Sequence, residues 1–558
     1  MTPRQKLLFA GLLAISAGLI FFRLGRQDLL GDDAHYATRA IGYFDYMSSR
    51  QQTTPVQWFG SRPWWSYLSF HDHPPLFFSI QHIFFNLFGV SVVVSRLTSA
   101  LAGLGSVIVM FFLGRRFGGD GLGFLAMTAL AMNNYFIWQA RIGLLESLFV
   151  FWLLLGLLYL VKALQGDDKF FIWSGVFFGA AMLTKYTFLF VLPAIGMYLL
   201  WQERSVFRSK KFWFGVTMWF LIISPILIFN FEMYKTRGHF DVQFADLFGQ
   251  GNADWPVLGN RIDGFHINLI EPMKSLGQGM SWPYFSGAVI SFLAVIVLAW
   301  RKQQKLLWLL LLPAALMFLF LVYVGGAERL LGVLSPFAAL IFAIAIFQLW
   351  KYRLTALTAG LLFVYCLIYI FNTNHAVAAP ANRFLVSTLR KENLGFNQLD
   401  QRLSHLLRQK RAPEAQKGVT NWIWYRQMKT EAIDFSELHD QSKQPWPYLF
   451  VYDVNMYWFP LAWVFDRWRF YDRFFIAGTD EFAAIVSAPN TRAVFDKYLT
   501  KDGMIFIKAG ENTKLKRGEE MSQTKYVLKH FTDQNIQPEV IRDDKGREAF
   551  YIYTELPR

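Results

Sequence analysis

The sequence predicts a polytopic α-helical membrane protein with about 11 spans, or up to about 13, followed by a soluble α/β domain. Of its 558 residues, 54% are hydrophobic and only 17% are charged, which is too apolar for an ordinary soluble protein. Apolar runs near the length needed to cross a bilayer recur as far as Phe371. Charges are frequent after that point, so we divide the chain into a membrane domain, residues 1–372, and a C-terminal domain, residues 373–558.

The first apolar run follows Arg4 and Lys6 and lacks a small-residue cleavage site, so we interpret it as a retained anchor. A shorter run, Leu76–Phe88, follows two prolines and contains His82 and Asn86. We predict that it is a juxtamembrane helix on the outer face, lying in the interface without crossing. The runs expected to cross are residues 7–24, 91–114, 121–139, 147–163, 170–184, 187–201, 212–231, 283–300, 306–324, 333–349 and 354–371.

The basic residues indicate which side each loop faces. With Leu76–Phe88 in the interface and a cytoplasmic N-terminus, every strong cluster of Lys and Arg lies on the cytoplasmic side, as positive-inside bias requires. The same bias explains the formal net charge of +15, so we expect no nucleic-acid partner. The predicted outer face then carries the C-terminal domain, the turn at Glu328, and the loops 25–75, 140–146 and 232–282.

Three acids on the predicted outer face are candidate catalytic residues. Asp32 and Asp33 follow the first span directly, and Glu146 stands where a later span begins. Acids close to a bilayer are costly unless they are hydrated or used, and a helix N-terminus favours them. A solvated loop and a helix cap are therefore the alternative interpretations of these residues.

The first outer loop ends with two histidines on either side of an acid, His71-Asp72-His73. Histidine and carboxylate side chains suit zinc or manganese, so a divalent metal could bind here. Adjacent residues do not easily share one ion, and Asp72 and His73 would need more distant ligands such as His239 or His266. The only cysteine, Cys366, lies in an apolar run, which excludes an internal disulfide.

Three cations on the predicted outer face run against the inside bias and therefore need a reason. Lys185 could meet a lipid phosphate or extend to the interface, Arg329 could bind phosphate or pair with Glu328, and Arg141 could bind phosphate or anchor the interface. Acids can deprotonate a hydroxyl and cations can stabilise a departing phosphate, so their presence on one face suits transfer from a phosphorylated lipid. The sequence contains no Gly-rich nucleotide-binding loop followed by lysine.

An ordered set of motifs in residues 5 to 350 resembles the membrane-embedded GT-C glycosyltransferases, the superfamily of protein O-mannosyltransferases and lipid A aminoarabinose transferases. The family's acidic pair, followed by a small residue and Tyr-Ala, appears here with Asp in place of the second acid, Glu. Glu146 likewise replaces a usual Asp. The matching stretches are Asp32 to Ala37, His73 to Leu76, Ser95 to Leu101, Arg141 to Glu146, Leu183 to Lys185, and Arg329 to Pro336.

This resemblance implies a role for each candidate residue. Asp32 would be the general base, Asp33 would position a substrate, and Glu146 would be a second acid in the same cavity. The phosphate of a polyprenyl-phosphate sugar donor would be held by Lys185, Arg329 and His73, and Arg141 is a further candidate because it lies on the same predicted face. Direct attack on the anomeric carbon would invert its configuration, and many relatives need no metal, so no cofactor is required by the resemblance.

The C-terminal domain shows short apolar or alternating runs typical of strands, with helical patterns among them. The predicted strands are Tyr448 to Val451, Ala483 to Val486, Met504 to Ile507 and Ala549 to Tyr553, and the predicted helices are Arg383 to Arg390 and Thr491 to Leu499. The segment from Trp446 to Phe475 is rich in aromatic residues, which suit a domain core, a membrane interface or a sugar-binding platform.

The leading hypothesis is a polyprenyl-phosphate-dependent glycosyltransferase in a bacterial inner membrane, with its active site and C-terminal domain on the periplasmic side. Its acceptor would be a lipid, a glycan or a protein, and its other partners would be membrane lipids. The alternative is a transporter or flippase of a lipid-linked sugar, which calls for polar residues within the spans and for repeated or broken helices. A catalytically silent assembly subunit is a third hypothesis.

Overall fold

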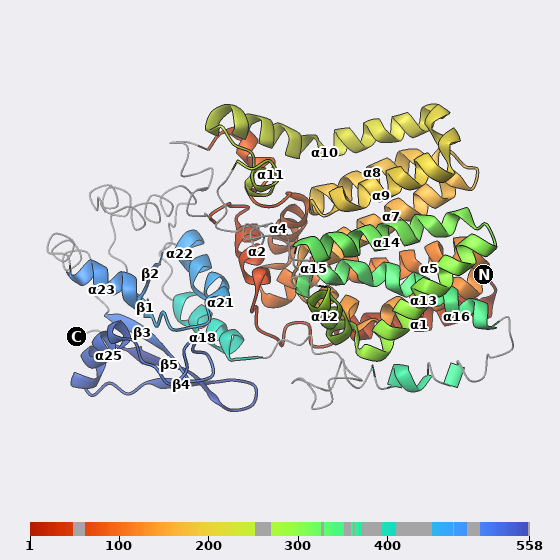
Figure 1. Cartoon of the computed structure of the whole chain (residues 1–558). Helices are drawn as coiled ribbons and strands as arrows, with labels where there is room; N and C mark the ends of the chain where they lie inside the picture. Colours follow the sequence, from red (N-terminus) through yellow and green to blue (C-terminus); the bar gives the residue numbers. More distant parts are fainter. Residues whose placement is uncertain are drawn as a thin grey trace. The chain divides into compact units, whose positions relative to one another are not determined.

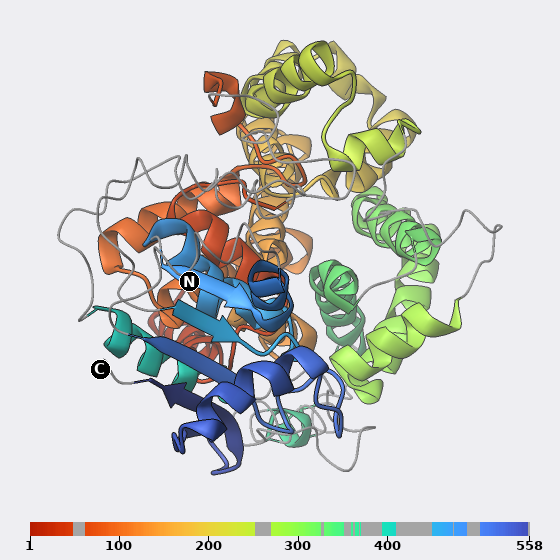
Figure 2. The ribbon, with the colours of Figure 1, turned by 90° about the vertical axis from the view of Figure 1, so that its left-hand side faces the viewer.

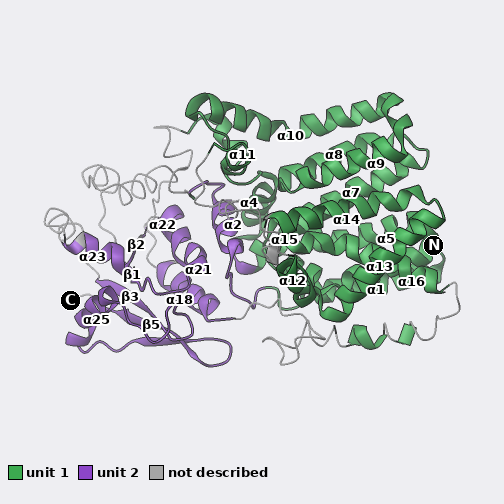
Figure 3. Cartoon of the chain, viewed as in Figure 1, with its two compact units in different colours: residues 1–24, 47–89, 93–390 green, residues 25–46, 90–92, 391–558 purple. Residues whose placement is uncertain are grey.

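The computed structural model describes residues 1–47, 62–250, 269–324, 328–350, 359–360, 363–367, 369, 393–408, 449–472, 474–487 and 503–555. The chain forms two compact units (Figure 3). Unit 1 comprises residues 1–24, 47–89 and 93–390, and unit 2 comprises residues 25–46, 90–92 and 391–558. The predicted domain boundary at residue 372 lies outside the described residues and stays a prediction, but the start of the first loop is part of unit 2.

Unit 1 is helical, and it confirms the prediction of a multi-pass membrane protein. Within the described ranges, seven helices are long and apolar enough to cross a bilayer, whereas α4, α8 and α9 are apolar but shorter. The number of spans stays a prediction, since most of the expected span 354–371 is not described. The helices of unit 1 are α1 (Pro3–Phe21), α4 (Leu76–Phe88), α5 (Val92–Ala131), α6 (Asn134–Arg141), α7 (Leu145–Leu164), α8 (Phe170–Thr184), α9 (Phe188–Gln202), α10 (Lys210–Arg237), α11 (Val242–Leu247), α12 (Ile270–Met280), α13 (Trp282–Arg301), α14 (Lys305–Val324), α15 (Glu328–Leu331) and α16 (Ser335–Trp350), with short 3-10 turns η1 (Trp64–Tyr67), η2 (Arg204–Arg208) and η4 (Gly332–Leu334).

Helix α5 is two antiparallel arms and not one straight rod. Its backbone leaves the helical conformation at Gly118 and Gly119, where Gly119 has φ +79°, a value that glycine adopts readily. The arms then pack on each other, with the rings of Phe111 and Phe124 4.9 Å apart. This hairpin accommodates the two successive apolar runs that the sequence shows here.

The predicted continuous span 121–139 is wrong in one respect. The second arm of α5 ends at Ala131, and a separate helix, α6, begins at Asn134. The side chain of Asn133 accepts a hydrogen bond of 3.1 Å from the backbone N–H of Phe136 and so caps α6. An asparagine cap satisfies an orphan N–H at a helix start, which explains why the chain breaks inside an apolar run.

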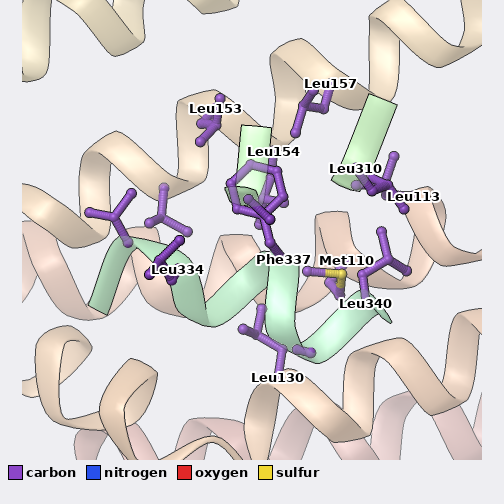
Figure 4. Close-up of a cluster of buried hydrophobic side chains, with 14 of the residues drawn as sticks. Met110, Leu113, Leu130, Leu153, Leu154, Leu157, Leu310, Leu334, Phe337 and Leu340 are labelled. Atoms are coloured by element: carbon purple, nitrogen blue, oxygen red, sulfur yellow. The ribbon is translucent and has the colours of Figure 1, made fainter. Parts of the chain in front are cut away.

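The bundle is held by helix pairs that pack along their lengths: α7 with α8, α8 with α10, α9 with α14, and α13 with α16. Figure 4 shows the centre of this packing, where Leu154 of α7, Phe337 and Leu340 of α16, and Met110 of α5 lie together. In Figure 1, the short helices α4, α11, α12 and α15 lie at the end of unit 1 away from the N-terminus. We call this end, where α7 begins and α8 ends, the loop end.

Helices α8 and α10 approach each other closely because glycines face each other. A Cβ atom added to Gly175 would lie 1.9 Å from the carbonyl oxygen of Gly215, and one added to Gly215 would lie 2.3 Å from that of Phe171. Small residues allow such backbone contact between membrane helices, where packing replaces the hydrophobic effect as the main attraction. This pair therefore fixes α10, whose C-terminal end leads into the loop end.

Unit 2 contains a five-stranded mixed sheet in the order β2-β1-β3-β5-β4, drawn in blue in Figure 2. The first three strands are parallel, and β5 runs antiparallel to both β3 and β4. Helices α23 and α25 pack beside strands of this sheet, and α18 packs near β4. The elements of unit 2 are α2 (Asp32–Ile41), α18 (Phe396–Arg408), β1 (Leu449–Tyr452), α21 (Phe459–Leu461), η5 (Ala462–Asp466), α22 (Arg467–Tyr471), β2 (Phe475–Gly478), α23 (Thr479–Ser487), β3 (Met504–Ala509), α25 (Ser522–Asp533), β4 (Glu539–Arg542) and β5 (Glu548–Thr554).

The sheet confirms the predicted α/β domain and three of its four predicted strands, which coincide with β1, β3 and β5. The strand predicted at Ala483 to Val486 is wrong, because these residues belong to helix α23. Asp480 and Glu481 in the first turn favour the helix start, a signal that outweighs the short apolar run. The helices predicted at Arg383 to Arg390 and Thr491 to Leu499 lie outside the described residues.

The α8–α10 contact predicts that Gly175→Ala destabilises the protein by about 1–3 kcal/mol, the usual cost of overpacking. Thermal unfolding of the purified protein in nanodiscs would measure the loss. Gly196→Ala is the matched control, because Gly196 also lies within an apolar helix but has nothing within 4 Å of an added Cβ. Equal melting temperatures for the two variants would contradict the proposed backbone contact.

Candidate active site

Glu146 and Lys185 form a buried ion pair at the loop end of unit 1. Glu146 lies in the first turn of α7, and Lys185 directly follows α8 in extended conformation. Because these neighbouring helices run antiparallel, the start of one meets the end of the other, and Lys185 Nζ donates to Glu146 Oε1. The side chains are only 12% and 2% exposed, so each charge depends on the other for compensation.

The first turn of α7 also holds polar atoms that could receive a ligand. Among the described residues, neither Glu146 Oε2 nor the hydroxyl of Ser147 has a hydrogen-bond partner, although both are buried. Burying such atoms unsatisfied is costly, and each is a group that a bound hydroxyl could satisfy. Glu146 thus combines one oxygen held by Lys185 with a second oxygen available as an acceptor.

A second buried network starts at the next residue, Tyr186. Its hydroxyl donates a 2.6 Å hydrogen bond to Asp241 Oδ2, which also accepts a 3.1 Å bond from Asn230 of α10. The other oxygen of Asp241 caps α11 by accepting from the backbone N–H groups of Gln243 and Phe244 at 3.1 and 3.0 Å. Asp241 therefore joins the turn between α8 and α9 to the third predicted outer loop.

Burial determines the protonation of this network. It raises the pKa of Asp241 above its ordinary value, an effect opposed by the N–H of Phe244 and by Tyr186 and Asn230, and assisted by the charge of Asp72. Burial and the charge of Asp241 raise the pKa of Tyr186 well above its ordinary value. Tyr186 therefore keeps its proton and acts as a donor at physiological pH.

The first predicted outer loop joins the same network. The carbonyl oxygen of His71 accepts from the N–H of Val242 at 2.8 Å, and that of Asp72 accepts from the side chain of Gln243 at 2.7 Å. Asp72 Oδ2 lies 2.9 Å from His73 Nδ1. The structure thus brings together segments from three loops that the sequence placed on one face, with Lys185 and Tyr186 at their junction.

Arg141 binds the C-terminal end of α1. Its guanidinium donates to the carbonyl oxygens of Leu19 and Phe22 at 3.1 and 2.7 Å, and so caps the end of α1. Burial, with the positive charge of Arg96, lowers the pKa of Arg141 to about 10, which still leaves it charged at neutral pH. A role in binding phosphate stays a prediction.

Asp32 and Asp33 occupy the first turn of α2 in unit 2, where the helix dipole favours carboxylates. Asp33 is fully buried, and its Oδ1 accepts a 2.9 Å hydrogen bond from the N–H of Gly31. Asp32 is the more exposed of the two. Glu146 and Lys185 belong to unit 1, so the predicted catalytic acids are divided between the units.

Of the remaining predicted site residues, the structure describes His239 in full and Arg329 in part. Arg329 lies in the short helix α15, but its side chain is outside the described residues, as is the whole of His266. His239 lies two residues before Asp241, and its Nδ1 is 2.8 Å from the carbonyl oxygen of Phe240. The predicted metal site of Asp72, His73, His239 and His266 therefore stays a prediction.

Sequence reasoning missed Tyr186, Asn230 and Asp241. Asn230 is an amide within an otherwise apolar run, and such a polar residue in a span calls for a buried partner. Asp241 precedes a short amphipathic stretch and so had the signature of a helix cap. These signals indicate that Asn230 and Asp241 each have a buried polar partner. They do not show that Asp241 accepts from both Tyr186 and Asn230.

Comparisons with known proteins match parts of this chain to a family and to individual relatives. Residues 72–229 match the model of the dolichyl-phosphate-mannose-protein mannosyltransferase family. A protein of Aquifex aeolicus is 24% identical over 238 residues, 42% of this chain and 44% of its own length. The candidate mannosyltransferase YycA of Bacillus subtilis is 31% identical over 141 residues, 25% of this chain and 21% of its own. The chain thus spans less than half the length of either relative.

Solved structures show the same fold at low identity. The structure of ArnT from Cupriavidus metallidurans bound to undecaprenyl phosphate superposes with a TM-score of 0.53 and 13% identity, covering 98% of this chain and 97% of that one. The oligosaccharyltransferase of Archaeoglobus fulgidus tethered to an acceptor peptide gives 0.50 and 12%, covering 91% and 69%. The likeness to these structures shows a shared fold, and the family match covers residues 72–229 of this chain.

The buried ion pair predicts a large asymmetry between single and double substitutions. Lys185→Met leaves Glu146 buried without its cation and should cost about 3–5 kcal/mol, whereas adding Glu146→Gln should recover most of that loss. Melting temperatures in nanodiscs would test this. Lys169→Met is the control, since Lys169 and Asp167 form a pair that is 62% and 47% exposed and should contribute little. A double variant as unstable as Lys185→Met would contradict the interpretation.

The raised pKa of Asp241 predicts a pH-dependent contribution to stability. A carboxyl with a higher pKa in the folded protein stabilises the fold below its unfolded pKa, near 3.8, and this contribution is lost as the pH rises through the folded value. The melting temperature of the wild type minus that of Asp241→Asn should therefore fall as the pH rises above about 4. A difference that rises with pH would show that the bonds to Asp241 outweigh burial.

Proposed function

We propose that this protein is a glycosyltransferase that takes a sugar from a polyprenyl-phosphate donor of the undecaprenyl type. The observation that carries the proposal is the buried Glu146–Lys185 pair at the loop end, inside the segment that matches the mannosyltransferase family. ArnT, which shares the fold, is the protein seen with undecaprenyl phosphate. The acceptor is a hydroxyl of a lipid, a glycan or a protein.

In this proposal, cations at the loop end hold the donor phosphate. Lys185 has three N–H donors and gives one to Glu146, so the others can meet a phosphate oxygen. His73, Arg329 and Arg141 are the further proposed contributors. A cation close to the leaving phosphate stabilises the charge that develops as the sugar departs, and it does so best where water is excluded.

The acids have separate roles in the proposed reaction. Asp32 takes the proton of the acceptor hydroxyl while the hydroxyl oxygen attacks the anomeric carbon. The bond from that carbon to the phosphate oxygen breaks. The electron pair leaves with the polyprenyl phosphate, so one displacement inverts the anomeric configuration. Asp33, at the start of α2, positions the acceptor or the donor, and the available oxygen of Glu146 binds a substrate hydroxyl.

The proposed setting is a bacterial inner membrane, with the loop end and the C-terminal domain on the periplasmic side. A lipid-linked donor suits this side because it needs no soluble nucleotide. The reaction as written requires no cofactor, and a divalent metal near Asp72 and His73 would be an addition to it. Membrane lipids, together with the donor and acceptor, are the expected partners.

The test is turnover of radiolabelled polyprenyl-phosphate sugars by the purified protein in nanodiscs, across a panel of acceptors. Asp32→Asn should lower kcat by roughly 10²- to 10⁴-fold, the usual contribution of a general base. Asp480→Asn is the matched control, because Asp480 is an exposed acid in the first turn of another helix of unit 2.

Activity retained in Asp32→Asn would remove the proposed base. A wild-type protein that turns over no donor, but moves a labelled lipid-linked sugar across the bilayer of a vesicle, would favour a transporter or flippase. An equal loss in Asp480→Asn would mean that Asp32→Asn reports only general damage to unit 2.

A further inference from the structure

The segment that precedes α2 is bound into unit 2 by one buried carboxylate, Asp28. Asp28 is fully buried and accepts hydrogen bonds from the backbone N–H groups of Leu394, Phe396 and Asn397 at 2.5, 3.2 and 2.8 Å. The last two belong to the first turn of α18. Asp28 therefore caps a helix that lies more than 360 residues later in the sequence, and the helix dipole strengthens this contact.

The contact is reciprocal. The side-chain amide of Asn397 donates to the carbonyl oxygens of Gly25, Arg26 and Gln27 at 3.1, 3.1 and 3.0 Å. Asn393 adds a 3.0 Å bond to the carbonyl oxygen of Arg26. A four-residue segment of the first loop thus exchanges at least seven hydrogen bonds with the start of α18, which fixes its conformation.

The other end of α2 is bound to the segment α21–η5–α22. The hydroxyl of Thr38 donates to the carbonyl oxygen of Ala462 at 3.0 Å, and the hydroxyl of Tyr471 donates to the carbonyl oxygen of Thr38 at 2.5 Å. The ring of Tyr471 lies so close to Gly42 that an added Cβ would be 2.2 Å away. This leaves little room for α2 to shift.

The two attachments are themselves connected. Asp400 of α18 forms a buried ion pair with Arg467 of α22 and accepts a 3.1 Å hydrogen bond from the indole of Trp463. The same helix that Asp28 caps therefore also holds the segment that contacts Thr38. Asp28, α18, α22 and α2 form a closed ring of contacts within unit 2.

We propose that the C-terminal domain is part of the catalytic machinery, because it holds α2 and thereby fixes the position of Asp32. Asp28 is then a positioning residue, which acts on Asp32 through the three residues that separate it from the start of α2. The proposal rests on the proposed function for its catalytic consequence, whereas the attachment of α2 can be measured without any turnover.

The test combines hydrogen–deuterium exchange with kinetics on the full-length protein in nanodiscs. Asp28→Ala should raise amide exchange at least tenfold in peptides that cover residues 25–41, with little change in the spans of unit 1. It should lower kcat by roughly 10- to 100-fold, the cost of a misplaced reacting group, while the KM for the donor changes less than about threefold. Tyr471→Phe, a milder change, should do the same to a smaller extent.

Asp544→Asn is the matched control. Asp544 forms an ion pair with Arg26 in the same segment, and the Arg26 side chain is 37% exposed. Loss of this ion pair should therefore alter neither amide exchange nor kcat. Unchanged exchange in residues 25–41 of Asp28→Ala and Tyr471→Phe would overturn the proposal, whatever their activity. Raised exchange with unchanged kcat, in a wild type that is active, would also overturn it. If the wild type turns over no donor, the proposed function fails, and the exchange data alone decide whether the domain holds α2.

Discussion

Inside a bilayer, every backbone N–H and C=O must find a partner within the protein, and this constraint governs the shape of unit 1. Long helices satisfy their own backbone groups, so a helix can end only where other groups bond to the N–H and C=O groups left at its ends. Asn133 supplies an acceptor where α6 begins, and Arg141 supplies donors to the carbonyl oxygens at the end of α1. Asn133 and Arg141 thus satisfy backbone groups at helix ends.

The same requirement explains why the candidate site is built from pairs. A charge that lies at a helix end near the bilayer is tolerated when an opposite charge or a donor meets it, as Lys185 meets Glu146 and Tyr186 meets Asp241. Since Lys185 and Tyr186 are consecutive, one short turn carries both pairs. The turn between α8 and α9 therefore connects three loops.

In unit 2, buried side chains likewise satisfy backbone groups and charges. Its sheet and helices form a hydrophobic core, and α2, a segment of the first loop, packs against α21 and η5 of the same unit. Backbone N–H groups at the start of α18 bind a carboxylate from that loop, and buried pairs such as Asp400 with Arg467 hold the rest. The elements of the C-terminal domain in unit 2 thereby hold α2, the helix that begins with Asp32 and Asp33.

The sequence by itself determined the fold class, because apolar length and positive charge respond directly to the bilayer, and local patterns were enough to find β1, β3 and β5. It also supplied Glu146 and Lys185 as candidates, since an acid and a cation beside a membrane require a reason. Only the tertiary structure decided that these two are partners, that Tyr186 and Asp241 form a second pair, and that Asp28 joins α2 to α18. The physical reason is that such contacts join residues from 39 to more than 360 positions apart, and no local periodicity or composition records which distant groups will satisfy each other once they are buried.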